Sequence, residues 1–132
     1  MVGPAELGAI GARIEDLDTP SLLLDLDKVE RNLTAMSRLF ATSRVKLRPH
    51  TKTHKVPILA LRQIERGAIG VCCAKLGEAE VMAAGGVPDV LLTTEVVGPL
   101  KLRRLLGVAR QTRVTTVVDD AGAAAQLSEA AL

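Results

Sequence analysis

The strongest constraint on the fold is a regular alternation of short apolar runs with longer amphipathic stretches, which continues from Asp18 onward. The short runs have the length and composition of strands, and we predict strands at 21–26, 45–50, 68–74, 89–94 and 113–120. The longer stretches carry apolar residues at helical spacing, and we predict helices at 27–43, 56–67, 77–86, 98–110 and 121–132. Asp27 is the expected N-cap of the first helix. Repeats of roughly 20 to 25 residues favour parallel strands joined by helical crossovers.

Two architectures fit such a series, an open doubly wound sheet and a (β/α) barrel. The glycine-rich phosphate-binding fingerprint of the dinucleotide fold is missing after the first strand. Charged and hydroxyl residues instead follow the strands, in the segments RPHTK, AK, TTE and DD. This favours a barrel, whose functional residues gather at the carboxyl ends of its strands. Because a closed barrel has eight strands, we predict an α/β fold in which about half of a parallel (β/α) barrel is present.

Composition narrows the functional classes. One Phe and no Trp or Tyr argue against nucleic-acid binding by base stacking, and a net charge of +2 offers little attraction for a polyanion. The sequence has no apolar run of about 18 residues, so we expect no membrane span. Its first residues lack a signal-peptide pattern, and we expect a cytoplasmic protein. Cys72 and Cys73 are adjacent and would point to opposite faces of a strand, where we expect them to pack as small apolar residues.

The segment RPHTKTHK, residues 48–55, concentrates basic side chains: Arg48, His50, Lys52, His54 and Lys55. One interpretation is a solvated loop. A second is a metal site, because His50 and His54 have the spacing of two helical ligands, although Pro49 is unfavourable in a helix and no flanking Glu or Cys completes the set. The third is a reactive lysine, since neighbouring cations disfavour the protonated form of Lys52 and a neutral amine can hold a carbonyl cofactor as a Schiff base.

Four segments of the chain carry a specific resemblance: DTPSLLLDLDKVERNL, LRPHTKTHK, GVCCAKLGEAEVMAAGG and DVLLTTEVVGPLKL. Together they closely resemble the N-terminal region of the D-threonine aldolase and D-serine dehydratase-like family, over about residues 16–132. Members of this family are pyridoxal 5'-phosphate enzymes of fold type III, with a barrel of the alanine racemase N-terminal type. The resemblance implies that Lys52 is both the catalytic and the cofactor-binding lysine.

The same resemblance sets expectations for the domains. It implies an N-terminal extension at 1–17 and, at 18–132, the N-terminal half of a cofactor-binding barrel whose strands lie at 45–49, 69–73, 89–93 and 114–118. The run at 21–26 would then pair with a C-terminal β domain that this chain lacks. Most contacts to the cofactor, and the ligands of a divalent metal, would also lie outside the chain. We therefore expect the isolated chain to be inactive and to self-associate through its open strand edges.

The function implied is that of a pyridoxal-phosphate-dependent lyase acting on small β-hydroxy D-amino acids. Aldolase and dehydratase activities stay equally open, and so do two other readings, a non-catalytic cofactor-binding barrel and an inactive fragment. His50 or His54 would assist proton transfer. Further residues have simpler expected roles as helix caps, turns or rim contacts: Asp16, Asp18, Asp25, Glu78, Thr93, Thr94, Glu95, Asp119 and Asp120.

Overall fold

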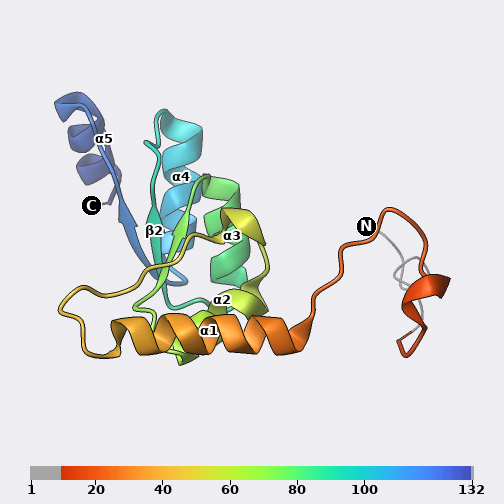
Figure 1. Cartoon of the computed structure of the whole chain (residues 1–132). Coiled ribbons are helices and arrows are strands. Elements are labelled where there is room, and N and C mark those ends of the chain that lie inside the picture. The colour runs from red at the N-terminus through yellow and green to blue at the C-terminus, as the bar shows by residue number, and fades with distance from the viewer. Residues whose placement is uncertain (1–9, 132) are drawn as a thin grey trace.

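The computed structural model describes residues 10–131 and has an α/β architecture. Its sheet contains the parallel strands β1 (Val71–Cys73), β2 (Asp89–Leu92) and β3 (Arg113–Thr116), which lie side by side in chain order. Helices connect and follow the strands: α1 (Leu26–Ala41), α2 (Pro57–Glu65), α3 (Leu76–Ala84), α4 (Pro99–Ala109) and α5 (Ala121–Ala131). Two 3-10 turns, η2 (Ile14–Asp16) and η3 (Thr51–Thr53), complete the order. The predicted parallel (β/α) fold is confirmed (Figure 1).

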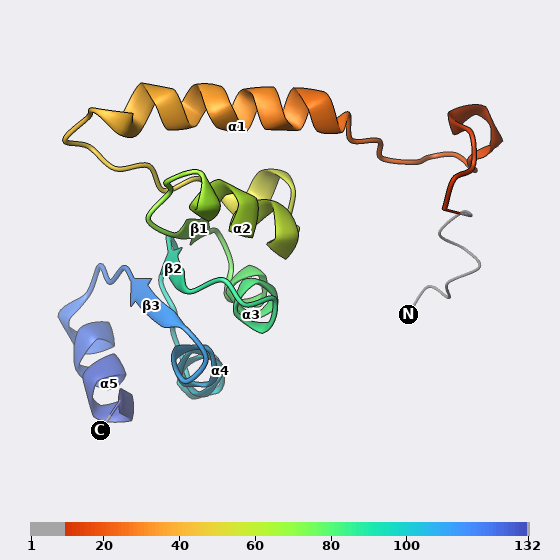
Figure 2. The ribbon, with the colours of Figure 1, turned by 90° about the horizontal axis from the view of Figure 1, so that it is seen from below.

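The two faces of the sheet differ in what covers them. Val71, Cys73, Val90 and Leu92 alternate along β1 and β2, and each is fully buried. They pack against apolar side chains of α2, α3 and α4, which Figure 2 shows on one side of the sheet. The opposite face carries side chains that are only partly buried or exposed, because no helix lies over it in the described part of the chain. In a (β/α) barrel this second face lines the interior.

The segment 45–50 forms less of a strand than its sequence predicts. It runs beside β1 and makes one isolated parallel bridge, between His50 and Cys72. The amide of Ile69 donates to the carbonyl of Leu47 at 3.0 Å, and that of Cys72 to the carbonyl of Pro49 at 2.7 Å. Pro49 has no N–H to return, so the ladder stays incomplete. The segment therefore occupies the position of the expected first barrel strand without the full hydrogen bonding of one.

The other strand predictions were wrong in extent or type: β1 and β2 are shorter than the predicted 68–74 and 89–94. The run at 21–26 is not a strand: residues 21–25 have no regular structure, and Leu26 already begins α1. Its leucines are exposed, because residues 10–25 extend away from the body of the molecule (Figure 1). The last strand ends at Thr116, and residues 117–120 lead into α5 without pairing. Residues 1–9 of the predicted N-terminal extension lie outside the described part.

Helix α1 begins two residues earlier than expected. Asp25, and not Asp27, is its N-cap, and the Asp25 carboxylate accepts the amide of Lys28 at 3.0 Å. The helix is strongly amphipathic, yet none of its residues is buried. Polar contacts attach it to α2 and its C-cap: Glu30 accepts hydrogen bonds from Arg62 and Arg66, both at 2.6 Å. Cavities lined by residues of both helices lie between them.

Candidate functional site

Lys52 lies in the turn η3, which follows the 45–50 segment at the carboxyl end of β1. The neighbouring Thr51 is fully buried, and its hydroxyl donates to the carbonyl of Cys72 at 3.0 Å. Because Thr51 points into the sheet, the next residue of the tight turn points away from it, and Lys52 is exposed. The structure thus places the predicted lysine at the edge of the sheet where barrel enzymes carry their active sites.

His50 connects the lysine turn to β2. Its Nδ1 accepts the amide of Lys52 at 3.3 Å, so in the neutral imidazole the proton is on Nε2. Nε2 lies 3.5 Å from the hydroxyl of Thr93, which itself donates to the carbonyl of Cys73 at 3.1 Å. These contacts form a chain of hydrogen bonds with one direction, from Lys52 through His50 and Thr93 to β1. The His50 imidazole therefore lies at the same strand edge as Lys52.

His54 faces a different part of the molecule. Its Nδ1 accepts the amide of Val56 at 3.0 Å, and its Nε2 is buried beside Gln63 without a hydrogen-bond partner among the described residues. Both side chains line a cavity of about 170 Å³ below α1. Burial lowers the pKa of His54 below its ordinary value, and contacts with Gln63 and the Val56 amide only partly oppose this shift. Of the two histidines, His50 and not His54 is placed to act near Lys52.

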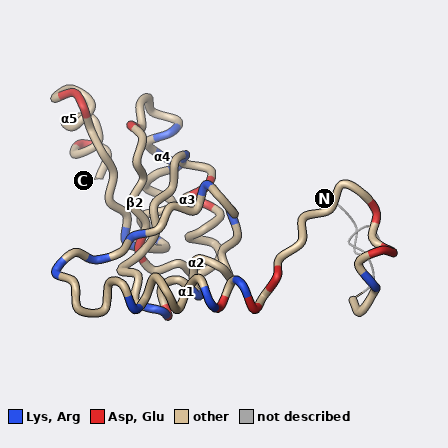
Figure 3. The backbone as a smooth tube through the Cα atoms, viewed as in Figure 1, with Lys and Arg blue, Asp and Glu red and all other residues tan. Residues whose placement is uncertain are grey.

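The strongly basic neighbours of Lys52 are each paired with a carboxylate. Arg48 Nη1 lies 2.6 Å from Asp89 Oδ1, in an ion pair whose side chains are only 20% and 14% exposed. Lys55 Nζ lies 3.6 Å from Glu78 Oε1. Figure 3 shows acidic and basic positions interspersed along α1, whereas the loop that follows α1 carries only basic ones. These pairs place a carboxylate beside both strongly basic neighbours of Lys52 in the segment.

Glu78 both accepts backbone amides at the start of α3 and pairs with Lys55. Its Oε2 accepts the amides of Ala74 at 2.8 Å and Lys75 at 3.4 Å, just before α3 begins, while its Oε1 faces Lys55. Burial raises the pKa of Glu78, but the two amide hydrogen bonds and the charge of Lys55 outweigh that effect and leave the pKa below its ordinary value. Glu78 therefore stays ionised and ties the lysine segment to the start of α3.

The other predicted rim residues divide between structural and exposed positions. Thr94 donates its hydroxyl to the carbonyl of Ala74 at 2.6 Å, which closes the carboxyl end of β1 against that of β2. Glu95 is exposed. Asp120 accepts the amide of Ala123 at 2.9 Å and caps α5 as predicted, whereas Asp119 is exposed. Only Thr93 among them contacts the candidate site directly.

The cysteines behave as the sequence predicts. Cys73 is fully buried against the helices, and Cys72 is half-buried on the other face of β1. Burial raises the pKa of both thiols. Within residues 10–131, no three His, Cys, Asp or Glu side chains gather as a metal site would require. His50 and His54 also point to different partners, which removes the geometric basis of the two-histidine metal interpretation.

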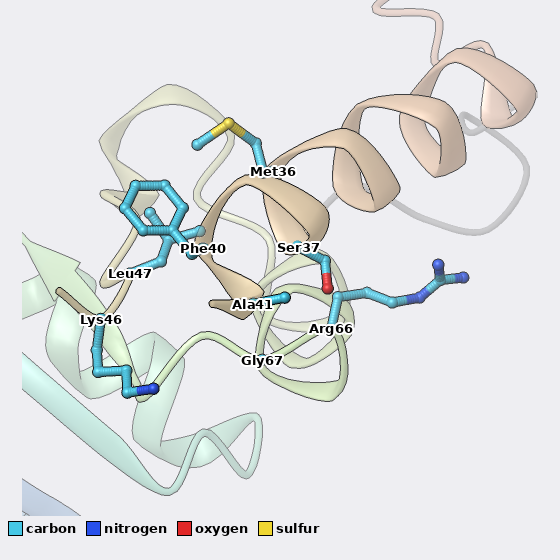
Figure 4. A pocket seen from close by; sticks show the side chains of 8 residues that line it. All are labelled: Met36, Ser37, Phe40, Ala41, Lys46, Leu47, Arg66 and Gly67. Atoms are coloured by element: carbon cyan, nitrogen blue, oxygen red, sulfur yellow. The ribbon is translucent and has the colours of Figure 1, made fainter. Parts of the chain in front are cut away.

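The cavity shown in Figure 4 lies away from this edge. It measures about 210 Å³ and is enclosed by the end of α1, by Lys46 and Leu47, and by Arg66 and Gly67. Two cations line it, but Figure 4 shows the side chains of Lys46 and Arg66 projecting in different directions. Arg66 is moreover bound to Glu30 and Thr34. The cavity has no converging donors for an anion and does not extend the site around Lys52.

An exposed lysine at the carboxyl edge of a parallel sheet, with helices on one face, is typical of a (β/α)-barrel protein whose site lies at the barrel rim. The sequence comparison specifies which kind of barrel. Residues 24–132 match the family model described as alanine racemase, N-terminal domain. The chain belongs to this family and contains part of its barrel.

Characterised relatives share the chain's sequence and its fold. It is 46% identical over 127 residues to D-threonine aldolase of Arthrobacter sp., a match that covers 96% of this chain and 33% of the relative. The crystal structure of D-threonine aldolase from Filomicrobium marinum superposes with a TM-score of 0.84 at 49% identity, covering 89% of this chain and 32% of that one. D-threo-3-hydroxyaspartate dehydratase from Delftia sp. HT23 gives a TM-score of 0.75 at 34% identity, over 86% and 30%. The chain therefore spans about a third of the length of these proteins.

The sequence did not indicate Asp89 or Gly70 as parts of the site. Asp89 begins β2, and an aspartate at a strand end is ordinarily read as a turn residue. Gly70 precedes β1, and a Cβ at this position would lie 2.4 Å from Arg48 Nη1. The sequence offered only a weak signal for Asp89, namely an acidic residue directly before an apolar run in the second βα repeat after Arg48.

No helix in the described residues is long and apolar enough to cross a membrane.

Proposed function

We propose that the chain supplies the lysine-bearing part of a pyridoxal-phosphate-dependent lyase that acts on small β-hydroxy D-amino acids. The observation that carries this proposal is the placement of Lys52, exposed at the carboxyl edge of the sheet within RPHTKTHK. The relatives support it, because they include aldolases and a dehydratase whose names specify β-hydroxy D-amino acids.

The residues at this edge fit one end of the cofactor. An aldehyde requires a primary amine, which Lys52 offers in an exposed position, and polar groups that do not compete with that amine. Such groups at this edge are the imidazole of His50 and the hydroxyl of Thr93. For a divalent metal the fit fails within residues 10–131, which contain no suitable ligand cluster. We therefore assign no role in the chain's chemistry to a metal.

Bound pyridoxal phosphate supplies an electron-withdrawing ring that stabilises negative charge at the substrate Cα. Three residues of the chain have roles at this edge. Lys52 provides the amine that holds the cofactor, and Thr51 fixes the turn to β1 by donating its hydroxyl to the Cys72 carbonyl. His50 keeps the Lys52 backbone in place through Nδ1, and its Nε2–H, which reaches Thr93, offers a proton donor at the same edge.

Between the two activities of the relatives, the aldolase is the better supported. Identity to the D-threonine aldolases is 46% and 49%, against 34% to the structure of the D-threo-3-hydroxyaspartate dehydratase. Cleavage of the Cα–Cβ bond of a D-threonine-like substrate is therefore the reaction we assign to the complete enzyme.

Reductive labelling tests the role of Lys52 directly. The chain is incubated with pyridoxal 5'-phosphate, reduced with borohydride and digested, and mass spectrometry identifies the modified lysine. We expect the label on Lys52 in the wild type, and its loss in Lys52→Arg with an unchanged circular dichroism spectrum. A dominant label on Lys46 or Lys55 would refute the assignment. In a full-length D-threonine aldolase, replacing the corresponding lysine should also abolish D-threonine cleavage.

A non-catalytic cofactor-binding barrel is the second candidate, because the matched family model describes a domain of the barrel type and Lys52 is exposed at the carboxyl edge of its sheet. Assays of D-threonine cleavage and of D-serine elimination on the full-length protein distinguish the two. A protein that binds the cofactor through Lys52 and shows neither activity would be a carrier.

A further inference from the structure

We propose that Asp89 and Glu78 are positioning residues for Lys52, each holding one cation of the RPHTKTHK segment on either side of the lysine. This inference rests on the proposed function, in which Lys52 is the working amine. It gives Arg48 and Lys55 the role of anchoring the segment, in place of the role of disfavouring the protonated form of Lys52.

The need for anchors follows from the weak pairing of this segment. Residues 45–50 receive only two backbone hydrogen bonds from the segment beside them, at the carbonyls of Leu47 and Pro49. They form one isolated bridge with β1. A regular parallel strand would be fixed along its whole length by evenly spaced hydrogen bonds. The segment must therefore be held in register by side chains.

The first anchor lies at the start of the segment. Arg48 reaches Asp89 Oδ1 at 2.6 Å, and both side chains are largely shielded from water. Gly70 lies directly beside this contact, since a Cβ there would lie 2.4 Å from Arg48 Nη1 and 2.7 Å from the Asp89 carbonyl oxygen. Arg113 approaches the other oxygen of Asp89 at 3.7 Å but is itself exposed. Arg48 thus passes over β1 and fixes the segment to β2, two residues before His50.

The second anchor lies just after the lysine. Lys55 has a φ of 55°, which is uncommon for a residue other than glycine, and its amide donates to the Thr51 carbonyl at 2.7 Å to close the turn. Its ammonium group faces Glu78, which is held by the amides of Ala74 and Lys75. The turn that carries Lys52 is therefore attached to two successive βα units, at Glu78 and at Asp89.

Two measurements on the chain test this arrangement in Asp89→Asn and Glu78→Gln. Hydrogen exchange of residues 48–55 reports the order of the segment without cofactor. The ratio of borohydride-fixed pyridoxal phosphate on Lys52 to that on Lys46 reports the placement of the amine. Loss of a shielded, charge-assisted hydrogen bond should lower this ratio about tenfold in Asp89→Asn. The more exposed pair should lower it about threefold in Glu78→Gln.

Glu80→Gln is the matched control, because Glu80 lies on the same helix and pairs with Arg104 at 2.7 Å away from the segment. It should leave the ratio unchanged. The double variant Arg48→Gln with Asp89→Asn, which restores a neutral hydrogen-bonded pair, should recover a large part of the labelling. If Asp89 had a merely structural role, its substitution would lower the overall stability. It would not selectively lower the labelling of Lys52, and the double variant would not recover that labelling.

If Asp89→Asn does not fold, Lys55→Met tests the second anchor, with Lys75→Met as its control. Unchanged exchange and an unchanged labelling ratio in Glu78→Gln and Lys55→Met would overturn the proposal. A wild-type chain without label on Lys52 would instead refute the proposed function. In that case hydrogen exchange alone decides whether Asp89 and Glu78 order the segment.

Discussion

The Nε2 atom of His50 lies 3.5 Å from the hydroxyl of Thr93, so a residue of the lysine segment contacts the residue that directly follows β2. Because His50 Nδ1 accepts the Lys52 amide, this contact is compatible with only one neutral tautomer, the one protonated at Nε2. The imidazole thus bridges the lysine turn and the carboxyl end of β2, and its two hydrogen bonds fix its orientation.

The acceptor on His50 should matter for the order of the turn. His50 is the N-cap of η3, and Asn is among the best N-cap residues because its carboxamide oxygen can accept the same amide. We expect His50→Asn to preserve the protection of the Lys52 amide, and His50→Leu to lose about 1 kcal/mol of local stability. Amide exchange of Lys52 by NMR measures both. Equal protection in the two variants would show that Nδ1 does not cap the turn.

His54 should make stability depend on pH. Its pKa is lowered in the folded state from the ordinary value of 6.5, so the unfolded chain binds the proton more readily. Stability is therefore complete above about pH 6.5 and falls as the pH decreases below that value. Urea denaturation at pH 7.5 and 5.5 should show a larger loss in the wild type than in His54→Gln. His50→Gln, which keeps His54, is the control and should retain the full pH dependence.

Gly70 should not tolerate a side chain. Its φ is 151°, and an added Cβ would approach both Arg48 and the Asp89 backbone more closely than real Cβ atoms do. We expect Gly70→Ala to cost about 2–3 kcal/mol in the free energy of unfolding, as overpacked and backbone-incompatible positions do. Gly107, within α4, has open space around its Cα, so Gly107→Ala should stabilise the chain by about 0.5–1 kcal/mol. Denaturant titration compares the two, and similar values for both would contradict the packing described.

The two thiols should differ in reactivity. Cys72 is half-buried and Cys73 fully buried, and burial raises the pKa of both, so neither is predominantly a thiolate at neutral pH. A thiol reagent at pH 8 should modify Cys72 slowly and Cys73 only under denaturing conditions. Single Cys→Ala variants assign the two phases. Fast modification of Cys73 in the native chain would show that the packing between β1 and the helices opens readily.

The isolated chain should self-associate and should not cleave D-threonine. The outer edge of β3 and the face of the sheet opposite the helices are uncovered in the described residues, and open parallel edges readily pair with other chains. Sedimentation velocity between micromolar and millimolar concentrations should show a mass that increases with concentration. A single monomeric species with D-threonine cleavage would overturn this expectation.

Much of the fold is readable from the sequence because helical periodicity and end signals agree locally. Pro57 and Pro99 begin their helices as predicted, and Asp120 caps the last one. The strands were harder to define. The run at 21–26 has the composition of a strand, but a strand also needs a neighbour, and periodicity does not show where that neighbour is. At 45–50 the missing N–H of Pro49 reduces the pairing, although position and direction were anticipated.

The candidate site was only partly predictable for the same reason. Lys52 follows from its segment, and its exposure from the strand end. The contacts of Arg48 with Asp89 and of Lys55 with Glu78 span 41 and 23 positions in the sequence (89 − 48 and 78 − 55). A count of basic residues cannot detect partners at such distances. The distinct roles of His50 and His54 also depend on which neighbour each imidazole meets.

The order β1-β2-β3 follows the order of the chain, and α3, α4 and α5 each pack beside the helix that precedes them. A nascent chain could therefore add one βα unit after another onto a surface that already exists, as domains do when they assemble from the N-terminus during synthesis. Lys52 would then be set early, since its anchor Glu78 is translated 26 residues after it and Asp89 37 residues after it (78 − 52 and 89 − 52). The lysine turn would be in place before the residues beyond β3 emerge from the ribosome.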